Sequence, residues 1–216
     1  MTDSARSGRW WHFFSGAKTQ DMAAANTWLV IGLGNPGPRY ERTRHNIGQM
    51  VIAELSRRLG QQLKRHRSAA LVAEGFLHPG GPKLIVATLT SFMNVSGKQT
   101  AALASFYSIP PERIIVVHDE MDIPFDTIKL KIGGGHGGHN GLRDIAAALG
   151  TPEFVRVRTG IGRPDGRQDP ADFVLAPFSS TERETLPILI GDAADAAELV
   201  ATDGLTAAQL RFHTRS

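Results

Sequence analysis

The residues best suited to chemistry lie at the ends of predicted strands or in the loops beside them. His45 comes in the loop after the first buried run, and Asp119 comes at the end of another. In open α/β sheets, sites form outside the carboxyl ends of strands, so these two side chains are expected to meet. A carboxylate fixes the tautomer of an imidazole and stabilises the imidazolium, which makes the pair a candidate general base. The alternatives are a surface histidine and an aspartate that caps the turn before Pro124.

The predicted nucleophile of such a site is water. The chain has no cysteine, and it contains no G-x-S-x-G motif around a serine. Asn35, Asn94 and Asn140 are neutral donors and acceptors that suit holding a carbonyl, positioning water or stabilising an oxyanion. Together these residues predict hydrolysis of an ester or amide. The alternative for Asn94 and Asn140 is that each caps the N-terminus of a helix.

Two motifs resemble cofactor or metal sites. Residues 32–37 match G-x-G-x-x-G after a strand, but Pro36 and Pro38 favour a turn where a dinucleotide site needs a helix to start. His136 and His139 have H-x-x-H spacing without a carboxylate pair or a rigid helix. We therefore predict neither a cofactor nor a metal.

Basic residues are concentrated in two parts of the chain. Residues 39–67 hold eight Lys/Arg and two Asp/Glu, and residues 129–167 hold seven Lys/Arg and three Asp/Glu. By contrast, residues 169–203 hold one Lys/Arg and eight Asp/Glu, so this part of the chain is acidic. In the second part, Lys129 and Lys131 alternate on one predicted strand, and Arg156 and Arg158 on the next. Such pairs favour a phosphate clamp, and the alternative is a solvated strand face.

Strands that alternate with helices must position these residues. Short apolar or alternating runs predict six strands, at residues 28–33, 71–77, 84–89, 113–118, 127–132 and 155–161. Helical spacing predicts five helices, at residues 46–59, 95–107, 142–149, 181–201 and 205–212. A loop with six glycines in the nine residues 133–141 joins the predicted strand at residues 127–132 to the predicted helix at residues 142–149. The pattern predicts an α/β fold, a single-domain layer sandwich with a mixed β-sheet flanked by helices.

Composition and length set the class of protein. The 216 residues are 41% hydrophobic and 21% charged, which is typical of a globular domain and excludes a disordered chain. No apolar run is long enough for a membrane span. The absence of cysteine fits a cytoplasmic protein. We interpret residues 1–27 as a flexible N-terminal extension and residues 28–216 as the catalytic domain.

Five motifs resemble one family. They are Gly-Leu-Gly-Asn-Pro-Gly (32–37), Thr-Arg-His-Asn-Ile-Gly (43–48), Ser-Phe-Met-Asn-Val-Ser-Gly (91–97), His-Asp-Glu-Met-Asp-Ile-Pro (118–124) and Gly-Gly-Gly-His-Gly-Gly-His-Asn-Gly (133–141). In this order and spacing they resemble bacterial peptidyl-tRNA hydrolase. The resemblance covers about residues 28–212, and residues 1–27 lie outside it.

The resemblance implies a monomeric enzyme without a cofactor or metal. It implies hydrolysis of the ester between a peptide and the 3′ end of tRNA, which rescues tRNA from prematurely released peptidyl-tRNA during translation. By similarity, His45 is the general base, Asp119 orients it, and Asn140 holds the attacking water or the carbonyl. The partner is peptidyl-tRNA, and no membrane is involved.

The resemblance also assigns the surroundings of the catalytic pair. Asn35 and Asn94 shape the peptide channel. The cleft is lined by Tyr40, Met93 and His139. The phosphate clamp, which binds the 5′-phosphate region of tRNA, consists of Lys129, Lys131 and Arg158. The glycine-rich loop and the helix after it resemble a movable lid. Two other functions stay open: an RNA-binding relative without cleavage, and a small-molecule esterase or amidase.

Overall fold

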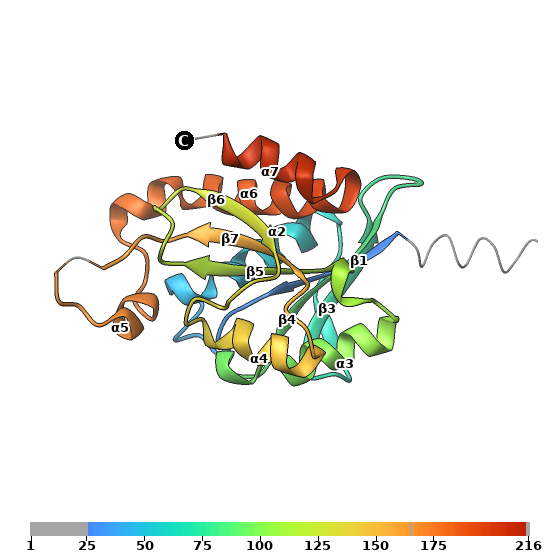
Figure 1. The fold of residues 1–216 in the computed structure, drawn as a ribbon, viewed down its shortest axis with the longest axis horizontal. Coiled ribbons are helices and arrows are strands. Elements are labelled where there is room, and N and C mark those ends of the chain that lie inside the picture. Colours follow the sequence, from blue (N-terminus) through green and yellow to red (C-terminus); the bar gives the residue numbers. More distant parts are fainter. Residues whose placement is uncertain (1–25, 165, 215–216) are drawn as a thin grey trace, which may run out of the picture.

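One mixed sheet forms the centre of the computed structural model, which describes residues 26–164 and 166–214 (Figure 1). Within these residues the sheet has seven strands in the order β2-β3-β4-β1-β5-β7-β6. The strands are β1 (Thr27–Gly32), β2 (Lys64–His66), β3 (Ala70–Phe76), β4 (Lys83–Leu89), β5 (Ile114–Glu120), β6 (Ile128–Ile132) and β7 (Val155–Gly160). β1, β4, β5 and β7 pair in parallel, whereas β3 and β6 are antiparallel to their neighbours. The predicted α/β fold with a mixed sheet is confirmed.

Helices cover both faces of the sheet. They are α2 (Ile47–Arg58), α3 (Gly97–Tyr107), α4 (Asn140–Leu149), α5 (Pro170–Val174), α6 (Ser180–Asp203) and α7 (Leu205–His213). Short 3₁₀ turns are η1 (Arg44–Asn46), η2 (Met93–Val95) and η3 (Pro111–Arg113). Helices α2, α6 and α7 pack on one face and α3 and α4 on the other, so that the sheet lies between two helical layers (Figure 1). None of the described helices combines the length and hydropathy that a membrane span requires.

The central strands are buried on both faces, which is why they appear in the sequence as unbroken apolar runs. On β5, Ile115 and Val117 face the α2/α6 layer, whereas Ile114 and Val116 face the α3/α4 layer. Each of these side chains has an exposed fraction of 0%. Burial of one such side chain stabilises the fold by about 1.5–3 kcal/mol. The end of β5, where Asp119 lies, is therefore a rigid platform.

Two glycines bring the start of α2 against the sheet. A Cβ on Gly48 would lie 2.3 Å from the Val117 carbonyl oxygen, and a Cβ on Gly32 would lie 2.2 Å from the carbonyl oxygen of Gly48. Any larger residue at either position would push helix and sheet apart. This close approach places η1, which precedes α2, beside the carboxyl end of β5.

The edge strand β6 is covered by the C-terminal helix. The Leu130 backbone N–H donates to Nε2 of His213 at 2.8 Å, and the Leu130 carbonyl accepts from Nε2 of Gln209 at 3.1 Å. Two side chains of α7 thus satisfy backbone groups that an edge strand would otherwise expose.

Several boundaries differ from the sequence predictions. The helix predicted at residues 95–107 begins at Gly97, because Met93–Val95 form a 3₁₀ turn, and the helix predicted at residues 142–149 begins at Asn140. Strand β2 and helix α5 were not predicted. Most of the predicted N-terminal extension, residues 1–25, lies outside the described residues.

Candidate active site

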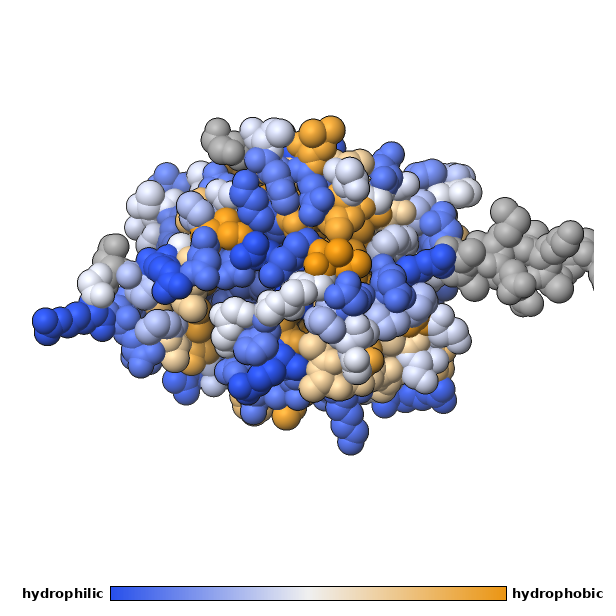
Figure 2. All heavy atoms as spheres, viewed as in Figure 1, coloured by the Kyte–Doolittle hydropathy of each residue, from blue (hydrophilic) through white to orange (hydrophobic). Residues whose placement is uncertain are grey.

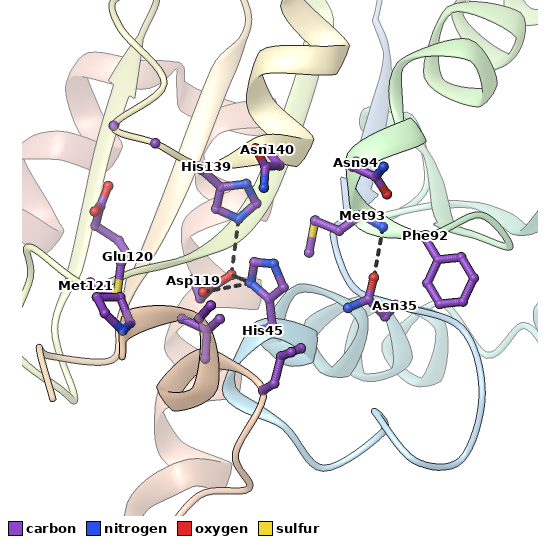
Figure 3. A pocket seen from close by; sticks show the side chains of 16 residues that line it. Asn35, His45, Phe92, Met93, Asn94, Asp119, Glu120, Met121, His139 and Asn140 are labelled. Atoms are coloured by element: carbon purple, nitrogen blue, oxygen red, sulfur yellow. Dashed lines mark hydrogen bonds and ion pairs between the residues drawn. The ribbon is translucent and has the colours of Figure 1, made fainter. Parts of the chain in front are cut away.

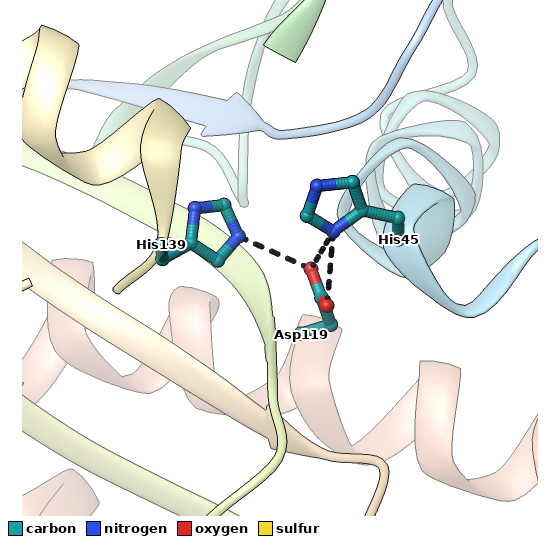
Figure 4. Close-up of side chains that lie close together, drawn as sticks. All are labelled: His45, Asp119 and His139. Atoms are coloured by element: carbon teal, nitrogen blue, oxygen red, sulfur yellow. Dashed lines mark hydrogen bonds and ion pairs between the residues drawn. The ribbon is translucent and has the colours of Figure 1, made fainter. Parts of the chain in front are cut away.

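The predicted catalytic pair is in direct contact. Asp119 lies near the end of β5 with an exposed fraction of 4%. Nδ1 of His45, on η1, lies 2.9 Å and 3.0 Å from the two Asp119 carboxylate oxygens (Figure 4). An ionised carboxylate only accepts hydrogen bonds, so Nδ1 of His45 carries a proton, and in the neutral ring Nε2 therefore keeps its lone pair. This is the tautomer that a general base at Nε2 requires.

A third side chain, His139, shares the carboxylate. Its Nε2 lies 3.1 Å from Oδ1 of Asp119, on the other side of that oxygen from His45 (Figure 4). His139 is the N-cap of α4, and its Nδ1 accepts from the Leu142 N–H at 3.4 Å. Because Nδ1 accepts, the proton is on Nε2 and points at Asp119. The alternative that Asn140 caps α4 is therefore wrong.

The positive charge of a protonated His45 and the negative charge of Asp119 stabilise each other. Burial lowers the pKa of His45, but the negative charge and the hydrogen bond of Asp119 outweigh that effect and raise it above the usual 6.5. Burial raises the pKa of Asp119, but the charge of His45 and the hydrogen bonds from both histidines hold it far below its usual range. Asp119 is therefore ionised at any physiological pH.

His118 is a buried, neutral neighbour of the group. Its ring packs edge-on against that of His139, with centroids 5.0 Å apart. Nδ1 of His118 donates to the Asp119 carbonyl at 2.7 Å. Burial, followed by the nearby His139, lowers the pKa of His118 to about 3. An uncharged ring thus supports His139 without competing for the carboxylate of Asp119.

Asn35 is held rigidly by the backbone around it. Its Oδ1 accepts from the Met93 N–H at 2.8 Å, which leaves Nδ2 as the free end of the amide, pointing towards His45 (Figure 3). The Asn46 side chain accepts from the N–H of Asn35 and donates to its carbonyl, both at 2.9 Å. Asn46, a residue that sequence reasoning missed, therefore fixes the loop that carries Asn35.

All but one of the side chains predicted for catalysis and substrate binding line one pocket of about 540 Å³. From the predicted set it is lined by Asn35, His45, Met93, Asn94, Asp119, His139 and Asn140 (Figure 3). Phe92, Glu120, Met121, two loop glycines and four residues of the α5 region complete the lining. Asn94 lies within η2 while Ser96 precedes α3, so Asn94 is not the helix cap that was the alternative.

Tyr40 is an exception to the predicted lining. It does not line the pocket, and its N–H donates to the Gly37 carbonyl in the turn that follows Asn35. Its ring packs edge-on against Phe92, with centroids 6.3 Å apart. Tyr40 therefore supports a lining residue.

The basic strand residues share one sheet face but differ in their contacts. Lys129 lies opposite Arg158, and Lys131 lies opposite Arg156. Nζ of Lys129 donates to the His213 carbonyl at 3.3 Å. Arg156 is buried and donates to the carbonyls of the glycine-rich loop, at 2.8 Å to Gly134 and 2.7 Å to Gly135. Arg156 thus fits neither alternative that the sequence left open for it, a phosphate ligand beside Arg158 or a solvated residue, because it is buried and anchors the loop.

Arg44 is a further residue that sequence reasoning missed. Its guanidinium contacts both carboxylate oxygens of Glu182, at 3.4 Å and 2.6 Å, and lies 4.3 Å from the centre of the Phe173 ring. These contacts tie the residue before His45 to the α5 wall of the pocket. Nothing in the local sequence signals them, because Glu182 is 138 residues away along the chain.

Three residues could supply metal ligands. His45, Asp119 and His139 each offer one atom, and within the described ranges these atoms lie within 4.8 Å of one another. Two imidazoles and a carboxylate are a donor set that suits zinc. In this site Nδ1 of His45 and Nε2 of His139 both hydrogen-bond to the Asp119 carboxylate. His136, the other member of the H-x-x-H motif, instead accepts from the Gly138 N–H at 3.1 Å.

Comparison with known proteins identifies the family. The family model described as peptidyl-tRNA hydrolase matches residues 29–216. The peptidyl-tRNA hydrolase of Renibacterium salmoninarum is 61% identical over 190 residues, covering 88% of this chain and 98% of the relative. That of Arthrobacter sp. (strain FB24) is 58% identical over 189 residues, covering 88% and 97%. The crystal structure of peptidyl-tRNA hydrolase from Acinetobacter baumannii is 35% identical with a TM-score of 0.80, covering 88% and 95%. The chain belongs to the peptidyl-tRNA hydrolase family.

Proposed function

We propose that His45 is the general base of peptidyl-tRNA hydrolysis, the reaction of this family, and that water is the nucleophile. The observation that carries this proposal is the contact of Nδ1 of His45 with Asp119 at 2.9 Å, which leaves Nε2 of the neutral ring as the basic nitrogen at the pocket. An oriented imidazole of this kind accelerates a reaction by about 10²–10⁴-fold.

The reaction proceeds in two steps. Nε2 of His45 accepts a proton as the water oxygen attacks the acyl carbon, and a tetrahedral oxyanion forms. The imidazolium, stabilised by Asp119, then donates that proton to the departing ribose oxygen. The products are the free peptide carboxyl group and tRNA with a free terminal hydroxyl, so no other reactant is consumed.

The amides around the pocket hold the substrate. Nδ2 of Asn35 is a donor for the peptide backbone or the developing oxyanion. Asn94 shapes the peptide channel, and Asn140, beside His139, holds the water or the carbonyl. Fixed donors of this type contribute about 10²–10³-fold when they contact the oxyanion.

The rest of the substrate is bound by charge. Lys129, Lys131 and Arg158 form the phosphate clamp for the 5′ end of tRNA, and they lie on the β6–β7 part of the sheet beside the pocket. Figure 2 shows hydrophilic side chains over much of this part of the surface, next to α7. We place the reaction in the cytoplasm, where translation supplies the substrate, and infer that the enzyme acts as a monomer, as its resemblance to the family implies.

The decisive experiment measures release of labelled peptide from peptidyl-tRNA. His45→Ala is expected to lower kcat by about 10²–10⁴-fold while the Kd for uncharged tRNA stays within about twofold. His78→Ala, which removes an exposed imidazole in the β3–β4 turn, is the matched control and should match wild type.

Each of the other outcomes rejects part of the proposal. Normal turnover by His45→Ala would rule out His45 as the base. No peptide release by the wild-type protein would indicate an RNA-binding protein without cleavage. Failure of uncharged tRNA to compete would indicate a small-molecule esterase.

A further inference from the structure

Glu120 lies between the catalytic pocket and the phosphate clamp. It is the last residue of β5, directly after Asp119, and it lines the pocket. Residues two apart on a strand face the same side, so Glu120 shares the sheet face of His118. His118 is in register with Arg158. Figure 3 shows the Glu120 side chain pointing away from the imidazole of His45.

The Glu120 carboxylate is bound to the arginine of the clamp. Its Oε2 accepts from Nε of Arg158 at 3.1 Å and lies 3.0 Å from Nη2. Its Oε1 accepts from the Asp122 N–H at 3.3 Å, which holds the carboxylate in place. The pair is partly buried, with side-chain exposed fractions of 23% for Arg158 and 15% for Glu120. It is therefore screened less by solvent than a fully exposed ion pair.

A phosphate that binds Arg158 must replace this carboxylate or share the guanidinium with it. A terminal phosphate carries about −1.5 to −2 charge at pH 7 and three acceptor oxygens. It can contact Arg158 and Lys129 together, because these residues lie opposite each other on β7 and β6. The Glu120 carboxylate carries only one negative charge, so it neutralises only part of the positive charge of Arg158 and Lys129.

We propose that Glu120 is an internal competitor for the phosphate clamp. Its carboxylate occupies Arg158 in the free enzyme and is displaced by the 5′-terminal phosphate of tRNA. This inference rests on the proposed function, because it requires that Arg158 binds that phosphate.

The competition lowers the affinity of the clamp for substrate and product alike. Affinity falls in proportion to the fraction of molecules in which the binding group is available. Product tRNA carries the same 5′ phosphate as the substrate, so return of Glu120 to Arg158 assists its release. The same carboxylate weakens binding of other phosphate-bearing RNAs to the clamp.

The test measures the Kd of uncharged tRNA bearing either a 5′ phosphate or a 5′ hydroxyl. Glu120→Gln keeps the size of the side chain and removes its charge. It is expected to tighten binding of the 5′-phosphorylated tRNA by about three- to tenfold, as for the loss of a competing ion pair. Binding of the 5′-hydroxyl tRNA should change by less than about twofold.

Two further variants separate this inference from general charge effects. Asp122→Asn removes a nearby exposed carboxylate that pairs with Arg163, so it should affect both tRNAs equally and weakly. Arg158→Gln should remove the preference for the 5′ phosphate, and adding Glu120→Gln to it should then have no effect on that preference. The thermal unfolding midpoint of each variant confirms that it is folded.

The outcomes distinguish the two proposals. If Arg158→Gln keeps the wild-type phosphate preference, Arg158 is not part of the clamp and the functional assignment of the clamp fails. If Arg158→Gln loses the preference but Glu120→Gln binds both tRNAs like Asp122→Asn does, the clamp stands and the role of Glu120 is rejected.

Discussion

Asn46 holds Asn35 through both ends of one amide. Its Oδ1 accepts from the N–H of Asn35, and its Nδ2 donates to the carbonyl of the same residue. Since Asn46 directly follows His45, the segment that carries the base also fixes the loop that carries a substrate-binding amide. The base and the amide are therefore kept at a constant separation by one buried side chain.

Asn46→Ala should reduce both stability and turnover. It leaves two buried backbone groups of Asn35 without partners, which costs about 1–3 kcal/mol for each unsatisfied group. Urea unfolding measures the loss of stability, and peptide release measures the fall in kcat. Gln49→Ala is the control, because it removes only the weaker 3.3 Å contact with Asn46. Equal losses in both variants would show that the bonds to Asn35 have no special role.

The pH dependence of the reaction should report the environment of His45. A general base acts when it is neutral, and the pKa of His45 is raised above 6.5 by the charge and hydrogen bond of Asp119 against the effect of burial. The value of kcat/KM should therefore rise with pH along an apparent pKa above 6.5. In Asp119→Asn, burial remains without the charge, so the apparent pKa should fall and the plateau should drop by up to about 10⁴-fold.

The control for this profile is Asp122→Asn. Asp122 is an exposed carboxylate close to the same strand and does not contact His45. Its removal should leave the apparent pKa in place. A profile of Asp119→Asn that overlays the wild-type profile would exclude Asp119 as the group that sets the basicity of His45.

The basic residues of β6 and β7 should differ in function, because Lys129 and Lys131 bind phosphate whereas Arg156 anchors the glycine-rich loop. Lys129→Ala combined with Lys131→Ala should weaken tRNA binding and reduce the slope of log Kd against log salt by about one to two, near 0.9 for each lost phosphate contact. Arg156→Lys keeps the charge but cannot hold both loop carbonyls. It should lower the thermal midpoint and kcat while the salt slope stays at the wild-type value.

A changed salt slope in Arg156→Lys would place Arg156 among the phosphate ligands after all. An unchanged slope in the double lysine variant would place the clamp elsewhere on the surface. Fluorescence titration of tRNA at several salt concentrations measures both.

Much of the fold could be predicted because the central strands are buried on both faces and therefore consist largely of apolar residues. The run around Ile115 and Val116 is apolar on both faces, so its length and position are evident from the sequence. The contact of His45 with Asp119 could be predicted because His45 follows β1 and Asp119 lies near the carboxyl end of β5, and these parallel strands end at the same edge of the sheet. Strand β2 was missed because Lys64–His66 is short and polar and shows no apolar pattern. It forms a strand because its backbone pairs with β3.

The partners of charged side chains could not be predicted in the same way. Arg156 and Arg158 alternate on one strand with the same sequence signal, yet one is buried under the glycine-rich loop and the other pairs with Glu120. That difference depends on where the loop after β6 folds back, which no local pattern encodes. Arg44 likewise finds Glu182 only when α6 packs beside η1.

The cover that α7 provides for β6 has a consequence beyond the single molecule. Without Gln209 and His213, the backbone of Leu130 would offer an unpaired donor and acceptor to any other extended chain. Chains cut before α7 are therefore expected to self-associate edge to edge through β6. We therefore expect α7 to lower the tendency of the folded protein to aggregate through this edge.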